Sequence, residues 1–197
     1  MTLRELISKE KAYLAPAVFN PLCAKIAQAV GFEMLYLGGG TLGYIKCGLE
    51  ANLNITELVQ AGVEIRAVAD LPLILDGACG FGDPMHMHHV IPLAEAAGFA
   101  AIEMEDQILP KRAHHHMGIE HMIPQELMEA KVREAVRARR SRDFLIIART
   151  NGVRSGNMTD ALKRAEAYRA AGADVIYIGV RNAEEIELRY PKLLRRV

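Results

Sequence analysis

Residues 100–116 read AAIEMEDQILPKRAHHH, and the rest of the chain is best interpreted outward from this stretch. It begins as an apolar strand, becomes acidic at Glu103, Glu105 and Asp106, and continues through Lys111 into three consecutive histidines. A short buried strand that ends in charged residues and leads into a loop is typical of α/β folds, which gather functional groups at the carboxyl edge of a parallel sheet. The stretch therefore predicts such a sheet, with its chemistry at that edge.

The alternation of strand and helix extends in both directions from this stretch. Apolar runs predict strands at 15–19, 34–37, 73–75, 100–104, 144–148 and 175–178, and periodic segments predict helices at 2–11, 21–30, 55–69, 85–97, 124–139 and 159–171. Several helices end in AAG or AVG directly before a strand, as expected of βα units. Strands that are almost entirely apolar are covered on both faces, which is typical of a parallel sheet inside a helical layer.

This pattern predicts a (β/α)8 barrel of the TIM type, with a doubly wound sheet as the alternative. A complete barrel needs eight units, and about six are visible in this chain. No linker or change in composition divides the sequence. We therefore expect one barrel domain over residues 1–197 that lacks the last units.

Composition narrows the classes of function. The 24 basic residues equal the 24 acidic ones, so neither a nucleic acid nor an anionic membrane is an expected partner. Cys23, Cys47 and Cys79 have no CxxC spacing, which fits a reducing compartment. The amino-terminal residues lack the apolar core of a signal peptide, and no run approaches the roughly 18 apolar residues of a membrane span. We expect a soluble, cytoplasmic protein.

Two carboxylates mark a candidate metal site. Asp76 ends the third predicted strand and Glu105 ends the fourth. Neighbouring parallel strands would place both on one edge, where oxygen ligands suit Mg²⁺ or Mn²⁺. The alternative is that Asp76 caps a turn and Glu105 is a solvated end residue.

The glycine run after the second strand has two interpretations. Residues 38–43, GGGTLG, satisfy the GxGxxG pattern of a dinucleotide loop. The residues that follow, 44–48, do not resemble the helix whose amino end would hold a pyrophosphate. The run more often brings bare backbone N–H groups close to an anion.

Seven histidines and one arginine are further candidates. His86, His88 and His89 form one group and His114–His116 with His121 another, and neither has the ligand spacing of a zinc site. The first group is interpreted as surface. A histidine just after Lys111 is placed to act as a general acid or base. Arg149 follows the fifth strand, where its guanidinium can bind a carboxylate at two points or pair with Glu105 or Asp76.

Together these segments resemble the isocitrate lyase/phosphoenolpyruvate mutase superfamily. The resemblance is carried by Tyr36–Gly40 (YLGGG), Asp76–Gly82 (DGACGFG), Glu105–Lys111 (EDQILPK), Ala148–Thr150 (ART) and Asp160–Gly172 (DALKRAEAYRAAG). Their order and spacing agree from Lys11 to Val180. The resemblance implies a (β/α)8 barrel, a Mg²⁺ ion, chemistry on 2-oxo acids or 2-hydroxy dicarboxylates through an enolate of the pyruvate type, and a homo-oligomer, either a dimer or a tetramer.

The resemblance also implies roles for individual residues. Gly39 and Gly40 resemble the backbone donors for the substrate carboxylate, and Tyr36 resembles the aromatic residue beside them. Asp76 resembles the direct metal ligand, Glu105 the carboxylate that reaches the metal through water, Lys111 the lysine of the gating loop, and Arg149 the arginine that binds the oxo acid.

The departures from the family pattern fall on charged and reactive positions. The family's DxD becomes Asp76-Gly77-Ala78, and an expected acidic residue is Ala51, with Glu50 as a possible substitute. Two carboxylates are thus replaced, so we expect the cation to be held more weakly than is usual in the family. A smaller departure is Gly38, which stands where the family usually has serine.

The gating loop also differs, because Ala113 stands where the lyases of the family carry an acidic cysteine. His115 or His114 then becomes the candidate acid of a lyase-like enzyme acting on a small carboxylate. The alternatives are a phosphonopyruvate-type mutase or hydrolase, and a non-catalytic relative that binds a 2-oxo acid.

Overall fold

A six-stranded parallel sheet forms the centre of the molecule. The structure is a computed structural model that describes residues 1–9, 11–180, 182 and 185. The strands are β1 (Ala17–Val18), β2 (Leu35–Leu37), β3 (Leu73–Asp76), β4 (Ala101–Glu105), β5 (Leu145–Thr150) and β6 (Val175–Ile178). The α-helices are α1 (Leu3–Ile7), α2 (Pro21–Ala29), α3 (Gly39–Ile45), α4 (Ile55–Arg66), α5 (Met87–Ala96), α6 (Gln125–Ala138), α7 (Gly152–Ser155) and α8 (Met158–Ala170). Three short 3-10 helices are η1 (Glu50–Asn52), η2 (Pro84–His86) and η3 (Ala113–Met117).

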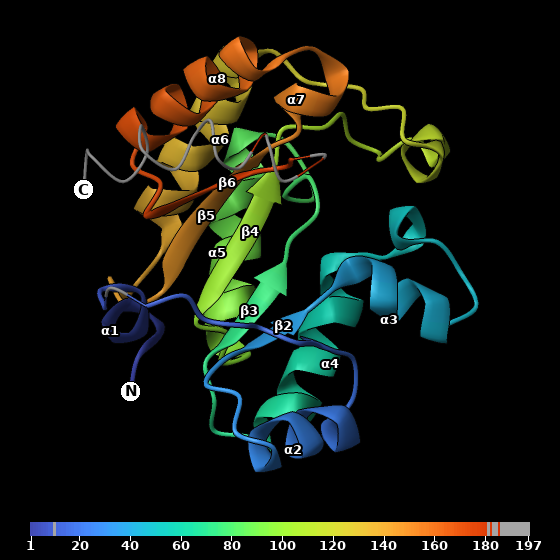
Figure 1. Ribbon diagram of the computed structural model, residues 1–197, viewed down its shortest axis with the longest axis vertical. Coiled ribbons are helices and arrows are strands. Elements are labelled where there is room, and N and C mark those ends of the chain that lie inside the picture. The colour runs from blue at the N-terminus through green and yellow to red at the C-terminus, as the bar shows by residue number, and fades with distance from the viewer. Residues whose placement is uncertain (10, 181, 183–184, 186–197) are drawn as a thin grey trace.

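The strand order selects the barrel over the doubly wound alternative. The strands pair in the sequential order β1-β2-β3-β4-β5-β6, and every pair is parallel. A doubly wound sheet reverses its strand order at a switch point and carries helices on both faces, whereas α5 and α6 lie together behind this sheet (Figure 1). The prediction of a TIM-type α/β barrel fold is confirmed, with six strands in the described part of the chain.

Side chains alternate between the two faces of each strand, as the pleat requires. Leu75, Ile102 and Ile146 point outward into the large core that the helices complete. Ile74 and Ala101 point to the inner face, where they pack with Leu3 and Leu6 of α1 in a second cluster. The outer face therefore holds the fold together, and the inner face is free to carry function at its carboxyl end.

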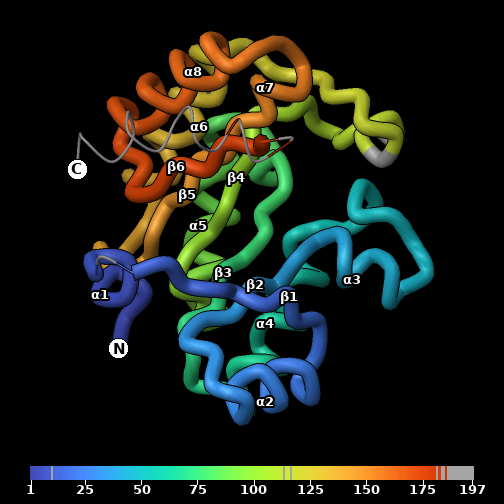
Figure 2. Tube along the Cα trace, viewed as in Figure 1, coloured from blue at the N-terminus to red at the C-terminus, as the bar shows by residue number. Residues whose placement is uncertain are grey.

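The amino-terminal segment covers the lower part of the inner face. The chain runs from α1 across the amino ends of the strands to β1 (Figure 2). Thr2 caps α1 in a capping box with Glu5, and Arg4 ties the helix to Asp174 at 2.8 Å. The helix ends at Ile7 rather than at Lys11, because only Leu3 and Leu6 bury apolar surface.

The segment after β2 differs from the sequence-based expectation. No helix was predicted between residues 38 and 54, yet α3 begins directly after β2 and η1 follows it. A helix of seven residues with three glycines has little intrinsic stability, and tertiary contacts supply it. Leu42 is buried, and a Cβ on Gly43 would lie only 2.8 Å from the backbone N of Glu50. Glycine is thus needed for the close approach of α3 to η1.

No helix in the described residues is long and apolar enough to cross a membrane.

Candidate active site

The carboxyl ends of β3, β4 and β5 bring charged side chains together on the inner face of the sheet. Backbone register pairs Asp76 with Glu103, Glu105 with Arg149, and Arg149 with Tyr177. Paired residues on adjacent strands stand about 4.8 Å apart and project to the same face. The carboxylates that the sequence assigned to one edge are therefore neighbours, and Glu103 stands with them.

Asp76 is held by backbone donors at the end of β3. Its Oδ2 accepts a hydrogen bond from Gly39 N at 3.1 Å, and its Oδ1 accepts one from Ala78 N at 3.0 Å. Gly77 lies between Asp76 and Ala78 in the sequence. There is no room for a side chain at this position, because a Cβ there would lie 2.6 Å from the Glu103 carbonyl oxygen. Burial, Glu50 and Glu105 together raise the pKa of Asp76. The carboxylate thus stands in a surplus of negative charge.

Lys111 is closed into the site between two carboxylates. Its Nζ lies 2.6 Å from Glu50 Oε1 and 2.6 Å from Glu105 Oε1, and its side chain is only 4% exposed. Burial acts to lower the pKa of Lys111, but Glu105 and Glu50 outweigh it and raise that pKa above its usual value. The lysine is therefore a charged bridge between η1 and β4. Glu50 therefore lies in the site. It was the possible substitute for the acidic residue that Ala51 replaces.

Arg149 is surrounded by groups of the protein itself. Its Nη1 donates to Glu103 Oε1 at 3.1 Å, its Nε lies 3.4 Å from Glu105 Oε2, and its guanidinium carbon lies 5.0 Å from the centre of the Tyr177 ring. Burial acts to raise the pKa of Glu105, but Arg149 and Lys111 outweigh it and lower that pKa. Asn151 Nδ2 also donates to Glu105 Oε2 at 2.7 Å. Glu105 is therefore a fixed, ionised carboxylate.

Glu103 belongs to the stretch of residues 100–116, but the sequence predicted no role for it. Its side chain is 8% exposed, and burial, followed by the charge of Asp76, raises its pKa to about 7 despite the bond from Arg149. The pattern of residues 101–105 contains a signal that could have found it, because alternate residues of a strand share a face. Glu103 and Glu105 must therefore point to the same side.

Asp106 faces away from the site, although it follows Glu105 directly. It is fully buried, and its Oδ2 accepts hydrogen bonds of 2.7 Å from Thr150 Oγ1 and from Tyr168 Oη. Its Oδ1 accepts a bond of 3.1 Å from Asn151 N. These contacts join β4, β5 and α8, so Asp106 supports the scaffold on which Glu105 and Asn151 are placed.

Backbone contacts join the two ends of the loop between β4 and α6. Gln107 bridges to Met122 in antiparallel fashion, and Ile108 N donates to the His121 carbonyl oxygen at 2.7 Å. The loop carries Lys111 near its start and His115 on η3. His115 Nδ1 lies 3.0 Å from Glu120 Oε2, and the side chain of Glu120 is fully buried. Glu120 and the loop thus fix the orientation of His115.

The remaining predicted site residues lie on β2 and α3. Tyr36 projects from β2 to the inner face, where burial, Asp76 and Glu103 raise its pKa far above the usual value. Gly39 begins α3 and donates to Asp76, and a Cβ on Gly40 would lie 3.8 Å from Glu50 Oε2. Both glycines therefore border the carboxylate cluster, while their role as donors to a substrate carboxylate stays a prediction.

The donor set fits a hard divalent cation. Asp76 and Glu105 supply the oxygen ligands that Mg²⁺ and Mn²⁺ prefer, and Mg²⁺ commonly uses one or two carboxylates and completes its shell with water. Among the described residues, no three His, Cys, Asp or Glu side chains converge as a finished ligand cage. Glu105 Oε1 is buried and, although Lys111 faces it, accepts no hydrogen bond of ordinary geometry. Asp76 and Glu105 are therefore the residues that could hold such an ion.

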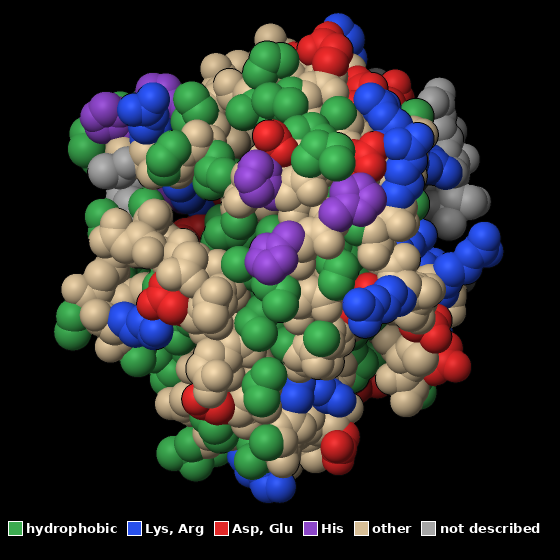
Figure 3. Space-filling model, turned by 180° about the vertical axis from the view of Figure 1, so that it is seen from behind, with side chains coloured by type: hydrophobic (Ala, Val, Ile, Leu, Met, Phe, Trp, Pro, Cys, Tyr) green, Lys and Arg blue, Asp and Glu red, His purple; other side chains and the backbone are tan. Residues whose placement is uncertain are grey.

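The histidines outside the loop lie on the helical side of the molecule. His86, His88 and His89 are exposed, and histidine side chains are visible at the middle of this face in Figure 3. His86 pairs with Asp83 and His88 with Glu134. Their interpretation as surface residues agrees with these positions.

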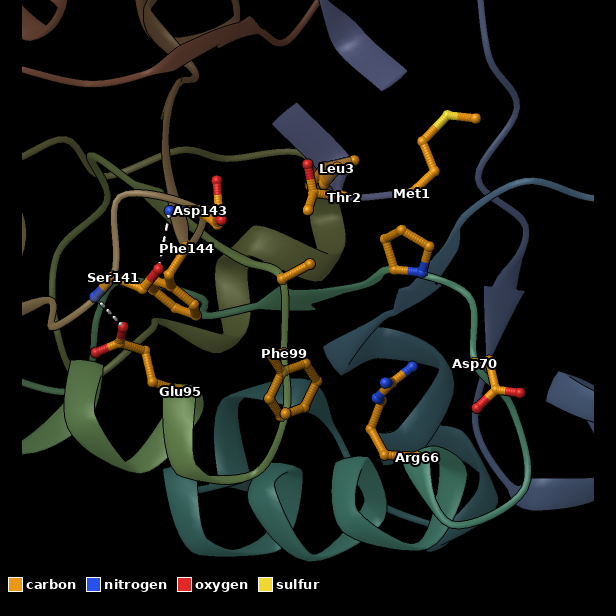
Figure 4. Close-up of a pocket in the computed structure, with 13 residues that line it drawn as sticks. Met1, Thr2, Leu3, Arg66, Asp70, Glu95, Phe99, Ser141, Asp143 and Phe144 are labelled. Carbon is orange, nitrogen blue, oxygen red and sulfur yellow. Dashed lines mark hydrogen bonds between the residues drawn. The ribbon is translucent and has the colours of Figure 1, made fainter. Parts of the chain in front are cut away.

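A pocket of about 300 Å³ lies at the opposite edge of the sheet, beside residues that immediately precede β3, β4 and β5. Figure 4 shows Arg66, Phe99 and Glu95 around it. Glu95 accepts from the backbone N–H groups of Arg140 and Ser141. Functional sites of parallel barrels lie at the carboxyl ends of the strands, so this pocket is separate from the charged cluster.

Comparison with known proteins identifies the family. The family described as phosphoenolpyruvate phosphomutase matches residues 3–190. The 2,3-dimethylmalate lyase of Eubacterium barkeri is 36% identical over 188 residues, which cover 93% of this chain and 64% of that protein. The 2-methylisocitrate lyase of Aeropyrum pernix is 38% identical over 181 residues, covering 90% and 57%. The chain thus spans about 57% to 64% of the length of these relatives.

Solved structures agree with this result. A phosphonopyruvate hydrolase in complex with oxalate and Mg²⁺ matches with a TM-score of 0.87 and 34% identity, covering 95% of this chain and 67% of that one. A 2,3-dimethylmalate lyase, described as a member of the PEP mutase/isocitrate lyase superfamily, matches with a TM-score of 0.84 and 26% identity, covering 93% and 62%. The chain belongs to the phosphoenolpyruvate phosphomutase family.

Proposed function

We propose that this chain is a lyase-like enzyme that cleaves a carbon–carbon bond in, or decarboxylates, a small 2-hydroxy or 2-oxo dicarboxylate with the help of Mg²⁺ or Mn²⁺. The observation that carries the proposal is the buried cluster in which Lys111 bridges Glu50 and Glu105 beside Arg149. Relatives named as lyases of dimethylmalate and methylisocitrate, and as an oxaloacetate decarboxylase, support the substrate class.

Carbon–carbon cleavage in a 2-hydroxy dicarboxylate needs a base, an acid and stabilisation of negative charge, and the proposed roles below cover the acid and the charge stabilisation. A base takes the hydroxyl proton, the bond breaks so that the hydroxyl carbon becomes a carbonyl, and the electron pair left on the other carbon takes a proton from an acid. A bound dication would stabilise negative charge that develops on the substrate oxygens. Arg149 and the N–H groups of Gly39 and Gly40 would bind the substrate carboxylate, with Tyr36 beside them, and Gly39 would exchange its bond to Asp76 for one to the substrate.

Lys111 and His115 are the proposed proton donors. Lys111 is charged and buried beside Glu105, so it is a proton donor placed at the metal side of the site. His115 is oriented by Glu120 on the same loop. A protonated imidazole can donate a proton, so His115 is the candidate for the proton that a cysteine supplies in the lyases of the family.

The assay is release of a 2-oxo acid or CO₂ from a panel of 2-hydroxy and 2-oxo dicarboxylates. We expect His115→Ala to lower kcat about 10²–10⁴-fold, the usual cost of losing a general acid, while substrate affinity is retained. His88→Ala, on the helical face, is the control and should leave turnover unchanged. Equal kcat values for His115→Ala and the parent protein would exclude His115 as the acid.

A phosphonopyruvate-directed activity is the second candidate, supported by the similarity to a phosphonopyruvate hydrolase and by a loop without the lyase cysteine. Release of phosphate from phosphonopyruvate would identify it. No turnover of either panel would favour a non-catalytic binding protein.

We also infer a homo-oligomer, because within the described residues β1 and β6 are each paired on one side only. We propose a cytoplasmic location, which fits cysteines without CxxC spacing. Light scattering that shows a stable monomer would contradict the oligomer.

A further inference from the structure

Glu103 lies between the two functional halves of the site. On one side its register partner on β3 is Asp76, the proposed metal ligand. On the other side its Oε1 accepts from Arg149 Nη1 at 3.1 Å. The residue is 6% exposed, so water does little to separate its two neighbours. One carboxylate thus stands within reach of both the cation position and the substrate-binding arginine.

The charges around Glu103 are unbalanced. Four carboxylates, those of Glu50, Asp76, Glu103 and Glu105, face two cations, Lys111 and Arg149. Lys111 is already shared by Glu50 and Glu105, and Asp76 receives only backbone hydrogen bonds among those described. Buried charge is stable only when it is paired. The negative charge in excess is concentrated on Asp76 and Glu103.

This surplus alters the expectation drawn from Ala78 and Ala51. Those alanines remove two negative groups from the family's metal site, but Glu50 and Glu103 place two others beside Asp76. Glu103 faces Asp76 from the neighbouring strand. Glu103 is simultaneously bonded to Arg149.

The guanidinium nitrogens Nη1 and Nε of Arg149 already face acceptors of the protein itself. Glu103 takes Nη1, while Nε faces Asn151 Oδ1 at 3.3 Å and Glu105 Oε2 at 3.4 Å. A substrate carboxylate that binds the guanidinium at two points must displace one of these acceptors. Glu105 is also held by Lys111 and Asn151, whereas Glu103 faces Asp76 and gains most from a cation there.

We propose that Glu103 couples cation binding to substrate binding: it supplies to the cation beside Asp76 the charge that Ala78 no longer provides, and in doing so it releases Arg149 for the substrate carboxylate. This coupling rests on the proposed function of the site. It makes Glu103 a positioning residue for Arg149 and predicts that the cation binds before the anion.

The test compares two binding constants on the full chain after treatment with EDTA, at pH 8, where Glu103 is ionised. Mn²⁺ and oxalate are titrated separately by calorimetry, with oxalate as the probe anion in the absence of metal. We expect Glu103→Gln to weaken Mn²⁺ binding about 10–100-fold, the range seen when groups that support a metal site are lost. The same variant should bind oxalate about 5-fold or more tightly without metal, a typical size for coupling between sites.

Two variants serve as controls. Glu134→Gln removes one negative charge from the exposed side of α6 and should change neither constant. Glu103→Asp keeps the charge and should retain most of the Mn²⁺ affinity. Circular dichroism of each variant verifies that the sheet and helices are retained.

The opposite directions of the two changes make the result decisive. If Glu103→Gln weakens oxalate binding together with Mn²⁺ binding, Glu103 only holds Arg149 in place and the coupling is wrong. If neither constant changes, Glu103 contributes to neither site. Neither measurement needs turnover, so a protein that shows both changes and converts no substrate would overturn the proposed function and leave the coupling intact.

Discussion

The pH dependence of stability gives a quantitative test of the charge cluster. Burial and Asp76 raise the pKa of Glu103 from 4.5 to about 7. The folded protein therefore keeps a proton at pH values where the unfolded chain has lost it. The stability that this proton contributes is fully present below about pH 4.5 and is lost as the pH rises through 7.

The magnitude follows from the size of the shift. One pKa unit corresponds to about 1.4 kcal/mol, so this shift corresponds to about 3 kcal/mol between pH 5 and pH 8, as an upper bound. Glu103→Gln removes the titrating group and keeps the shape of the side chain. The stability of the variant relative to the parent should therefore rise by up to this amount as the pH is raised.

The assay is urea unfolding followed by circular dichroism, in EDTA, at half-unit pH steps. The difference between the two proteins at each pH cancels the contributions of groups that titrate in both. A constant difference from pH 5 to pH 8 would show that Glu103 titrates in the folded state as it does in the unfolded chain, and that the described repulsion from Asp76 has no energetic weight.

Three further changes test the scaffold and the site. Asp106→Asn weakens the bonds from Thr150 and Tyr168 and should destabilise the protein by about 2–3 kcal/mol in urea unfolding, whereas a loss within measurement error would deny its anchoring role. Gly62→Ala places a Cβ 2.2 Å from Phe99 Cζ and should cost about 1–3 kcal/mol; an unchanged urea midpoint would mean that the ring moves freely. Arg149→Lys keeps the charge but loses the two-point fork, so we expect oxalate affinity to fall in the presence of Mn²⁺, and equal affinity would remove Arg149 from the substrate site.

Sequence patterns predicted the strands because these strands are short apolar runs bounded by glycine or charge. In β3 and β4, side chains that point outward alternate with side chains that point inward. This period of two can be read directly from the sequence. The helix α3 was missed because its stability comes from contacts with η1 and not from its own residues. Local propensity cannot indicate such a helix.

The residues of the site likewise include some whose position a local sequence pattern predicts and some whose position it does not. Asp76 and Glu105 end their strands and Arg149 lies one residue before the end of β5, inside the strand rather than after it, so their positions on one edge were predictable. Glu50 is brought in by its ion pair with Lys111, which lies 61 residues further along the chain. Such a contact depends on the path of two loops, and no pattern within either loop encodes it.

The opposite orientation of Glu105 and Asp106 limits how this lineage can change length. A deletion or insertion of one residue that shifted β4 in its register would exchange the two faces of the strand. The carboxylate that anchors α8 would then point into the site, and the carboxylate held by Lys111 would be driven into the apolar layer. Changes in loop length after Gln107 leave the register of β4 unaltered, whereas changes at Phe99 and Ala100 shift the phase of the strand.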